Sequence, residues 1–185
     1  LWLSPGDLPP ATGRGLLVVC SRSGETSESL RACDTFRKTG RGDVLYIGCY
    51  AGRSLESVSD YTLILPEAQE ESTAQTRAFS AMYLATTGLA LIAANRSQEL
   101  GALHSLAAAG RRLLDAHGDL ALAVGADLDL NRFYFLGSRA LYGLASELSL
   151  KMKEMTLSHS EPFHTLEFRH GPRSMATAGS CVVGL

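Results

Sequence analysis

The chain has 185 residues, of which 45% are apolar and 19% charged, and its formal net charge is −2. This composition argues against intrinsic disorder, and without a basic excess it argues against nucleic-acid binding by counterion release. The longest strongly apolar stretch, residues 88–94, is too short to cross a bilayer. The sequence therefore predicts a globular protein with neither a nucleic-acid nor a membrane partner.

Strands and helices are predicted to alternate through the first two thirds of the chain. Residues 1–13 are rich in Pro, Gly and Ser and are predicted to form a loop. Short apolar runs favour strands, and apolar residues at helical spacing favour helices. The expected strands are 15–20, 44–47 and 61–65. The expected helices are 28–38, 74–94 and a third from Ser97 to about His117.

The same alternation is predicted for the last third, although residues 118–131 fit no single element. The expected elements are a strand at 133–136, a helix at 140–155, an irregular segment at 158–172 and a strand at 181–185. Such alternation is typical of an α/β fold with a doubly wound parallel sheet. Ligands of such folds bind beyond the carboxyl ends of the strands. We therefore expect the functional residues in the turns after Cys20, Leu65 and Leu136.

The four cysteines, Cys20, Cys33, Cys49 and Cys181, form no CxxC pair. Three of them lie in or beside apolar runs, where a free cysteine behaves as a small hydrophobic residue. A chain of this length needs no disulfide framework. The sequence therefore predicts a reduced protein of the cytoplasm.

The turn after the first predicted strand combines three features of a phosphate site. Gly24 allows backbone N–H groups to converge on an anion. The helix that follows adds free N–H donors and the positive end of its dipole. Ser21, Ser23 and Thr26 add hydroxyl donors, and Arg22 adds positive charge. The alternative interpretation, an ordinary strand-to-helix turn with a capping box, stays open on this segment alone.

The predicted helix at 140–155 carries Glu147, Lys151 and Glu154 on one face, because their spacing is i, i+4 and i+7. A partly buried carboxylate beside a lysine can act as a general base near neutral pH. The alternative is a solvated row of ion pairs on a surface helix. On this helix alone the row of ion pairs is favoured, but two observations weaken that interpretation: the helix follows Gly137 and Ser138 at the end of a strand, and both of its flanks are apolar.

One histidine is a candidate for acid–base chemistry. His170 precedes a Gly–Pro break and is expected to project from a turn, although an exposed loop histidine is the alternative. His159, Glu161 and His164 form H-x-E-x-x-H, whose two histidines would not share a helical face. The sequence therefore predicts no metal site and no cofactor.

Three segments together resemble the sugar isomerase (SIS) domain family. Ser21-Arg-Ser-Gly-Glu-Thr26 resembles its phosphate loop, residues 147–154 its catalytic helix, and residues 167–172 its histidine loop. Residues 74–79 resemble a further segment of the isomerase domain of glucosamine-6-phosphate synthase. The histidine loop is closer to the standalone branch, which includes tagatose-6-phosphate ketose/aldose isomerases and amino-sugar phosphate deaminases. The resemblance covers residues 15–185.

The resemblance implies flavodoxin-like SIS subdomains, a homodimer with an active site shared between subunits, and a hexose or hexosamine 6-phosphate as the substrate. The phosphate-binding residues that it implies are Ser21, Arg22, Ser23, Gly24 and Thr26. Arg22 would line the loop, at a position where the synthase has Gln. Thr73 and Ser138 are implied as further substrate contacts.

The resemblance also implies an aldose–ketose isomerase, with release of an amine as a further activity of the same site. Glu154 would move a proton between C1 and C2 of the sugar, and Lys151 would assist that transfer. His170 would help ring opening and would reach in from the neighbouring subunit. Glu147 would orient its neighbours. The alternatives are a non-catalytic sugar-phosphate sensor and a doubly wound domain of unrelated role.

The resemblance sets an expectation for the domain organisation. Residues 1–131 would form a first SIS subdomain without its opening strand, and residues 132–185 would begin a second one. We therefore expect the sequence to be part of a longer protein.

Overall fold

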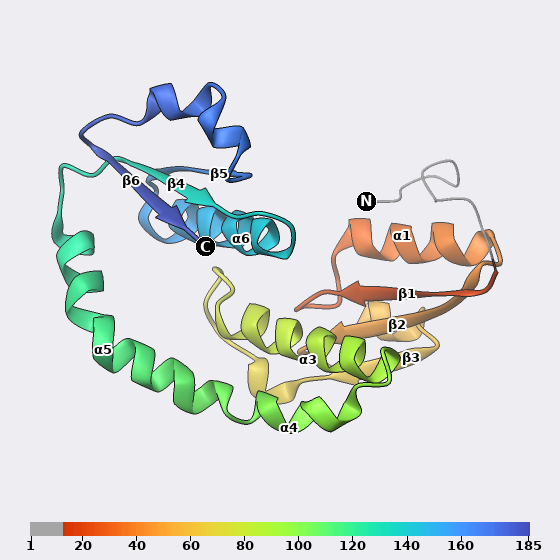
Figure 1. Cartoon of the computed structure of the whole chain (residues 1–185). Helices are drawn as coiled ribbons and strands as arrows, with labels where there is room; N and C mark the ends of the chain where they lie inside the picture. The colour runs from red at the N-terminus through yellow and green to blue at the C-terminus, as the bar shows by residue number, and fades with distance from the viewer. Residues whose placement is uncertain (1–12) are drawn as a thin grey trace. The chain divides into compact units, whose positions relative to one another are not determined.

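The computed structural model describes residues 13–185, so the loop expected at residues 1–13 lies outside them except for Gly13. Contacts divide the chain into two compact units, one ending at His104 and the other comprising Ser105–Leu185. Each unit contains its own three-stranded parallel sheet (Figure 1). The predicted α/β class with parallel strands is therefore confirmed. The assignment of residues 1–131 and 132–185 to two subdomains stays a prediction.

The first unit is built on a sheet of strand order β1-β2-β3. Its elements are β1 (Gly15–Cys20), α1 (Ser27–Lys38), β2 (Gly42–Gly48), α2 (Ser54–Ser57), β3 (Tyr61–Ile64), α3 (Arg77–Ala93) and α4 (Leu100–Leu103). Short 3₁₀ turns occupy Pro66–Ala68 and Ser97–Glu99. In Figure 1, α1 and α3 lie on opposite sides of this sheet.

The central strand β2 carries the core of the first unit. Val44 and Tyr46 are fully buried on it and pack with Cys33 and Phe36 of α1 and with Leu55 of α2. Parallel strands are buried on both faces in α/β folds, which is why β2 reads as a continuous apolar run.

A carboxylate determines where α3 begins. Glu70 accepts hydrogen bonds from the backbone N–H groups of Thr76 (3.0 Å), Arg77 (3.2 Å) and Ala78 (3.0 Å), and from the Thr76 hydroxyl (3.0 Å). These are N–H groups that a helix leaves unsatisfied at its start. Desolvation raises the pKa of Glu70, but the four donors outweigh it and hold the pKa below its ordinary value. The helix therefore begins at Arg77, three residues later than the spacing of apolar residues predicts.

The second unit has the strand order β5-β4-β6. Its elements are α5 (Leu106–Ala126), β4 (Arg132–Leu136), α6 (Ala140–Thr156), β5 (His159–Phe163) and β6 (Ser180–Gly184), with 3₁₀ turns at Glu167–Arg169 and Pro172–Met175. Helix α6 covers the sheet, and Ala145 packs against Phe133 and Phe135 of β4. The helix predicted after Ser97 is interrupted at His104, and α5 extends through part of the segment that fitted no element.

The irregular segment predicted at 158–172 is wrong in its first part, where β5 forms. Pro162 lies inside β5 opposite Phe135 of β4. Proline lacks an N–H donor, so it fits only the edge of a sheet, and β5 is an edge strand of the described sheet. Among residues 13–185, no helix combines the length and hydropathy that crossing a membrane requires.

Leu55→Ala should lower the free energy of unfolding by about 2–5 kcal/mol, because Leu55 is fully buried between α1 and the sheet. Leu63→Ala, on exposed β3 of the same unit, should cost less than about 1 kcal/mol. Urea unfolding followed by circular dichroism measures both. Equal losses of unfolding free energy for the two variants would contradict the placement of Leu55 in the core of the first unit.

Glu70→Gln should lower stability at pH 7 by up to about 1 kcal/mol, the typical contribution of a helix cap. The pKa of Glu70 is lowered by folding, so its contribution is complete above its unfolded pKa of about 4.3. It is lost as the pH falls through the folded pKa. The difference from wild type should therefore shrink between pH 5 and pH 3, as urea midpoints would record. Glu71→Gln, at the exposed neighbouring residue, is the matched control. If the stability difference between Glu70→Gln and wild type did not change with pH, the role of the Glu70 carboxylate in capping α3 would be contradicted.

Candidate functional site

The turn between β1 and α1 brings hydroxyl groups together. The Ser21 and Thr26 hydroxyls are 3.1 Å apart, and Ser21 Oγ accepts a hydrogen bond from the Gly24 N–H at 3.2 Å. Ser23 Oγ accepts from the N–H of Glu25 at 3.3 Å. Thr26 is the N-cap of α1, yet its side chain caps no backbone N–H. The capping-box alternative is therefore not the observed structure, and the start of α1 keeps donors for an anion.

The opposite side of this turn is fixed to α2. The Glu25 carboxylate accepts hydrogen bonds from the Ser54 N–H (2.9 Å) and hydroxyl (2.6 Å). Those bonds from Ser54, its hydroxyl first, lower the pKa of Glu25. The Gly24 carbonyl accepts from the N–H of Leu55 at 3.0 Å. These contacts give the turn a defined shape before any ligand is considered.

Arg22 connects the turn to a second loop. Its guanidinium donates to the Ser72 carbonyl at 2.6 Å, and Ser72 precedes Thr73, the residue predicted to contact substrate. The structure therefore brings Arg22 next to the loop that carries Thr73. Contact of either side chain with a ligand stays a prediction.

A polar hollow of about 420 Å³ lies in the same unit, at the carboxyl ends of β2 and β3. Its lining residues are Tyr50, Gln69, Glu70, Glu71 and Arg77. Gln69 donates to the Cys49 carbonyl at 2.8 Å and Arg77 donates to the Gln69 carbonyl. These residues were not predicted from the sequence, although ligands of such folds bind beyond the carboxyl ends of strands and these residues follow Leu65 or, for Tyr50, the end of β2.

Helix α6 brings the three predicted ionisable residues together in the second unit. Lys151 Nζ lies 2.5 Å from Glu154 Oε2 and 3.5 Å from Glu147 Oε1. The side chains of Lys151 and Glu147 are 16% and 17% exposed, whereas that of Glu154 is 38% exposed. Partial burial lowers the pKa of Lys151, but its contacts with Glu154 and Glu147 outweigh that and raise it. The group is thus a lysine cation held between two carboxylates.

The turn before α6 is tightly packed. A side chain on Gly137 would overlap the Leu141 carbonyl, which explains the glycine. The Ser138 carbonyl accepts a hydrogen bond from the N–H of Leu141 at 3.1 Å, and its side chain is exposed. Arg139 adopts a φ of 55°, a region that residues with a side chain seldom occupy. Substrate contact by Ser138 stays a prediction.

The histidines are distributed over the same unit. His170 is exposed and follows the 3₁₀ turn at Glu167–Arg169. His159 lies 3.0 Å from Glu161, and the His164 ring stacks on Tyr142 with 3.9 Å between centroids. Within the part of the chain that the structure describes, no three His, Cys, Asp or Glu side chains lie close enough to hold a metal ion.

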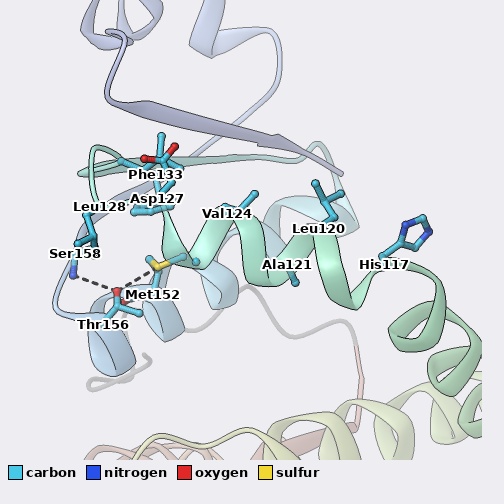
Figure 2. A pocket seen from close by; sticks show the side chains of 12 residues that line it. His117, Leu120, Ala121, Val124, Asp127, Leu128, Phe133, Met152, Thr156 and Ser158 are labelled. Atoms are coloured by element: carbon cyan, nitrogen blue, oxygen red, sulfur yellow. Dashed lines mark hydrogen bonds between the residues drawn. The ribbon is translucent and has the colours of Figure 1, made fainter.

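A larger, apolar hollow of about 630 Å³ lies between the second half of α5, the start of β4 and the end of α6. Figure 2 shows Leu120 and Val124 of α5 on this hollow, together with Met152 of α6. At one end of the hollow, the Thr156 hydroxyl accepts a hydrogen bond from the Ser158 N–H at 3.3 Å and donates to Met152 Sδ at 3.2 Å. None of the predicted site residues lines this hollow, so size alone does not identify the site.

The predicted residues therefore form two local groups. The hydroxyls of the turn after β1 lie in the first unit, and the Glu147–Lys151–Glu154 cluster lies in the second. Glu25, Glu70 and the buried Tyr46 were not predicted. Glu25 pairs with Ser54, which is distant in sequence, and the bonds from Glu70 to the start of α3 follow no regular spacing. The surroundings of Tyr46 are defined only once the strand and the turn are folded together.

Comparison with known proteins supplies the relatives of this chain. The SIS domain profile matches residues 128–185. The glutamine–fructose-6-phosphate aminotransferase (isomerizing) of Chlamydia trachomatis serovar D is 30% identical over 183 residues, which is 95% of this chain and 30% of that protein. The chain thus spans about 30% of the length of the curated relatives it matches.

Solved structures give the same relationship. The glucosamine-6-phosphate deaminase of Thermotoga maritima is 30% identical with a TM-score of 0.86, covering 99% of this chain and 56% of that one. The C-terminal domain of glucosamine-fructose-6-phosphate aminotransferase from Francisella tularensis is 25% identical with a TM-score of 0.82, covering 96% and 53%. Residues 128–185 therefore match the SIS domain, and the chain is similar to these aminotransferases and to the deaminase over nearly all of its length.

Proposed function

We propose that the protein is a phosphosugar isomerase that interconverts an aldose and a ketose of a hexose or hexosamine 6-phosphate. The observation that carries the proposal is the half-buried cluster on α6, with Lys151 Nζ 2.5 Å from Glu154 and 3.5 Å from Glu147. An aldose–ketose shift needs a positioned base and a cation near the developing oxyanion. The cluster supplies both.

Phosphate binding is assigned to the turn after β1. Ser21, Ser23 and Thr26 would supply hydroxyl donors, and the start of α1, where the Thr26 side chain caps no N–H, would supply backbone N–H groups. Binding the phosphate far from the reacting carbons allows binding energy to orient C1 and C2. The names of the relatives, a glucosamine-6-phosphate deaminase and an isomerising fructose-6-phosphate aminotransferase, support this substrate class.

The role of each side chain in the cluster depends on whether it carries a proton. Glu154 would take the proton from C2 of the aldose and return it to C1 through an enediol, or through an enamine-like intermediate for an amino sugar. Lys151 would stay protonated beside two carboxylates and stabilise the oxyanion. Glu147 would hold Lys151 in place, and His170 would assist ring opening. Release of ammonia, a homodimer that shares His170 between subunits and a cytoplasmic location are further parts of the proposal.

Glu154→Gln in the intact protein should reduce isomerisation at least about 100-fold, because the amide cannot accept the proton. The shift in melting temperature produced by hexose 6-phosphates should remain, because the variant keeps the turn after β1. A discontinuous assay of aldose–ketose conversion and a thermal-shift series measure the two effects. Unchanged turnover would remove Glu154 from the mechanism.

The control is Glu161→Gln, the same substitution in the same unit at a residue whose partner is His159. It should leave turnover within about twofold of wild type. If the wild-type protein binds phosphosugars without converting any of them, it is a sugar-phosphate sensor. If it binds none of them, the phosphosugar proposal itself is wrong.

A further inference from the structure

Tyr46 carries a buried hydroxyl with no partner. Its side chain lies on β2 and is fully buried. Among the residues that the structure describes, Tyr46 Oη is the single buried side-chain nitrogen or oxygen atom without a hydrogen bond. Buried polar groups are nearly always paired, so such an atom requires an explanation.

The hydroxyl lies directly beneath the turn after β1. A Cβ atom built on Gly24 would be 2.6 Å from Tyr46 Oη, and one built on Gly48 would overlap it. Gly24 has a φ of +70°, so the backbone approaches the phenol in a conformation that suits glycine. Two residues without side chains therefore make room for this hydroxyl on the sheet side of the turn.

Nearby backbone acceptors of the turn already have partners. The Gly24 carbonyl accepts from Leu55 at 3.0 Å, and the Arg22 carbonyl accepts from Cys49 at 3.2 Å. Ser21 Oγ accepts from the Gly24 N–H. Each of these oxygens has one donor already and none of them pairs with Tyr46 Oη, so the phenol keeps a proton to donate.

The hydroxyl is a donor at every physiological pH. Burial, with smaller contributions from Cys49 and Glu56, raises the pKa of Tyr46 to about 12. The group therefore keeps its proton, and a phosphate offers oxygens that only accept hydrogen bonds.

We propose that the Tyr46 hydroxyl donates a hydrogen bond to an oxygen of the phosphate bound by the turn after β1, and that it sets the affinity of this site. The proposal rests on the phosphosugar function above. It adds a donor from β2 to the donors of the turn and of α1. Gly24 is the part of the turn that permits this approach, because it presents only backbone to the phenol.

Tyr46→Phe keeps the ring and removes only the hydroxyl. In the intact protein it should weaken binding of inorganic phosphate and of glucosamine 6-phosphate about tenfold, the effect of one lost hydrogen bond to a charged acceptor. Its melting temperature without added ligand should equal or exceed that of wild type, because a buried unpaired donor is removed. Isothermal titration and thermal unfolding measure the two quantities. Unphosphorylated glucosamine serves as the ligand control.

Tyr134→Phe is the matched control. Tyr134 is also fully buried on a central strand, but its hydroxyl donates to the Met175 carbonyl at 3.4 Å. This variant should melt at a lower temperature and bind phosphate as wild type does. The opposite signs of the two stability changes separate a ligand donor from a structural hydrogen bond.

Each remaining outcome decides the matter. If the wild type binds glucosamine 6-phosphate and Tyr46→Phe binds it equally well, the role of Tyr46 is overturned while the proposed function stands. If Tyr46→Phe unfolds, the hydroxyl has a structural role and the inference is likewise overturned. If the wild type binds neither phosphate nor phosphosugar, both proposals are overturned together.

Discussion

The turn after β1 depends on the absence of a side chain at Gly24. A Cβ there would lie 2.6 Å from both Arg53 Cβ and Tyr46 Oη, and the φ of +70° would strain any other residue. Because the backbone fits closely over Tyr46, the Gly24 N–H reaches Ser21 Oγ and its carbonyl reaches the N–H of Leu55. The contact of the turn with α2 and its internal bond to Ser21 therefore both depend on that approach.

Carboxylates hold the loops around the first sheet through one recurring contact, a hydrogen bond that a carboxylate oxygen accepts from a backbone N–H group. Glu25 holds Ser54 at the start of α2, Glu70 holds the start of α3, and Asp60 accepts the N–H of Val44 at 2.8 Å. In each case an exposed or half-buried acid satisfies backbone donors that secondary structure leaves open. The loops are therefore ordered by groups outside the hydrophobic core. That arrangement leaves the hydroxyls of the turn after β1 and the N–H groups at the start of α1 available to a ligand.

The parts of the fold and the site that sequence reasoning predicted are those decided locally. The row of Glu147, Lys151 and Glu154 follows from helical spacing alone, and the turn after β1 from a glycine between a strand and a helix. Strand β5 was missed because Pro162 weakens its pattern, and only its edge position makes the proline acceptable.

Other features could not be predicted because they depend on contacts that hydrophobic periodicity does not encode. The start of α3 at Arg77 is determined by Glu70, and the environment of Tyr46 is determined by Gly24 and Gly48. A glutamate at position 70 and a tyrosine at position 46 are not unusual by themselves, so the residue types give no signal. Register between strands is needed before Tyr46 can be placed under the turn, and periodicity does not supply register for a strand buried on both faces.

The electrostatics of the α6 cluster restrict which of its side chains can be the base and which the cation in the proposed isomerisation. Two carboxylates within 3.5 Å outweigh burial and raise the pKa of Lys151, so this amine is a cation at neutral pH and cannot be the base. In the proposed isomerisation, proton removal would then belong to a carboxylate. Glu147 is 17% exposed and Glu154 is 38% exposed, so Glu154 is the one with room to meet a substrate carbon. A cation fixed beside that base favours the enediolate over the neutral sugar, because its charge matches the charge that develops in the transition state.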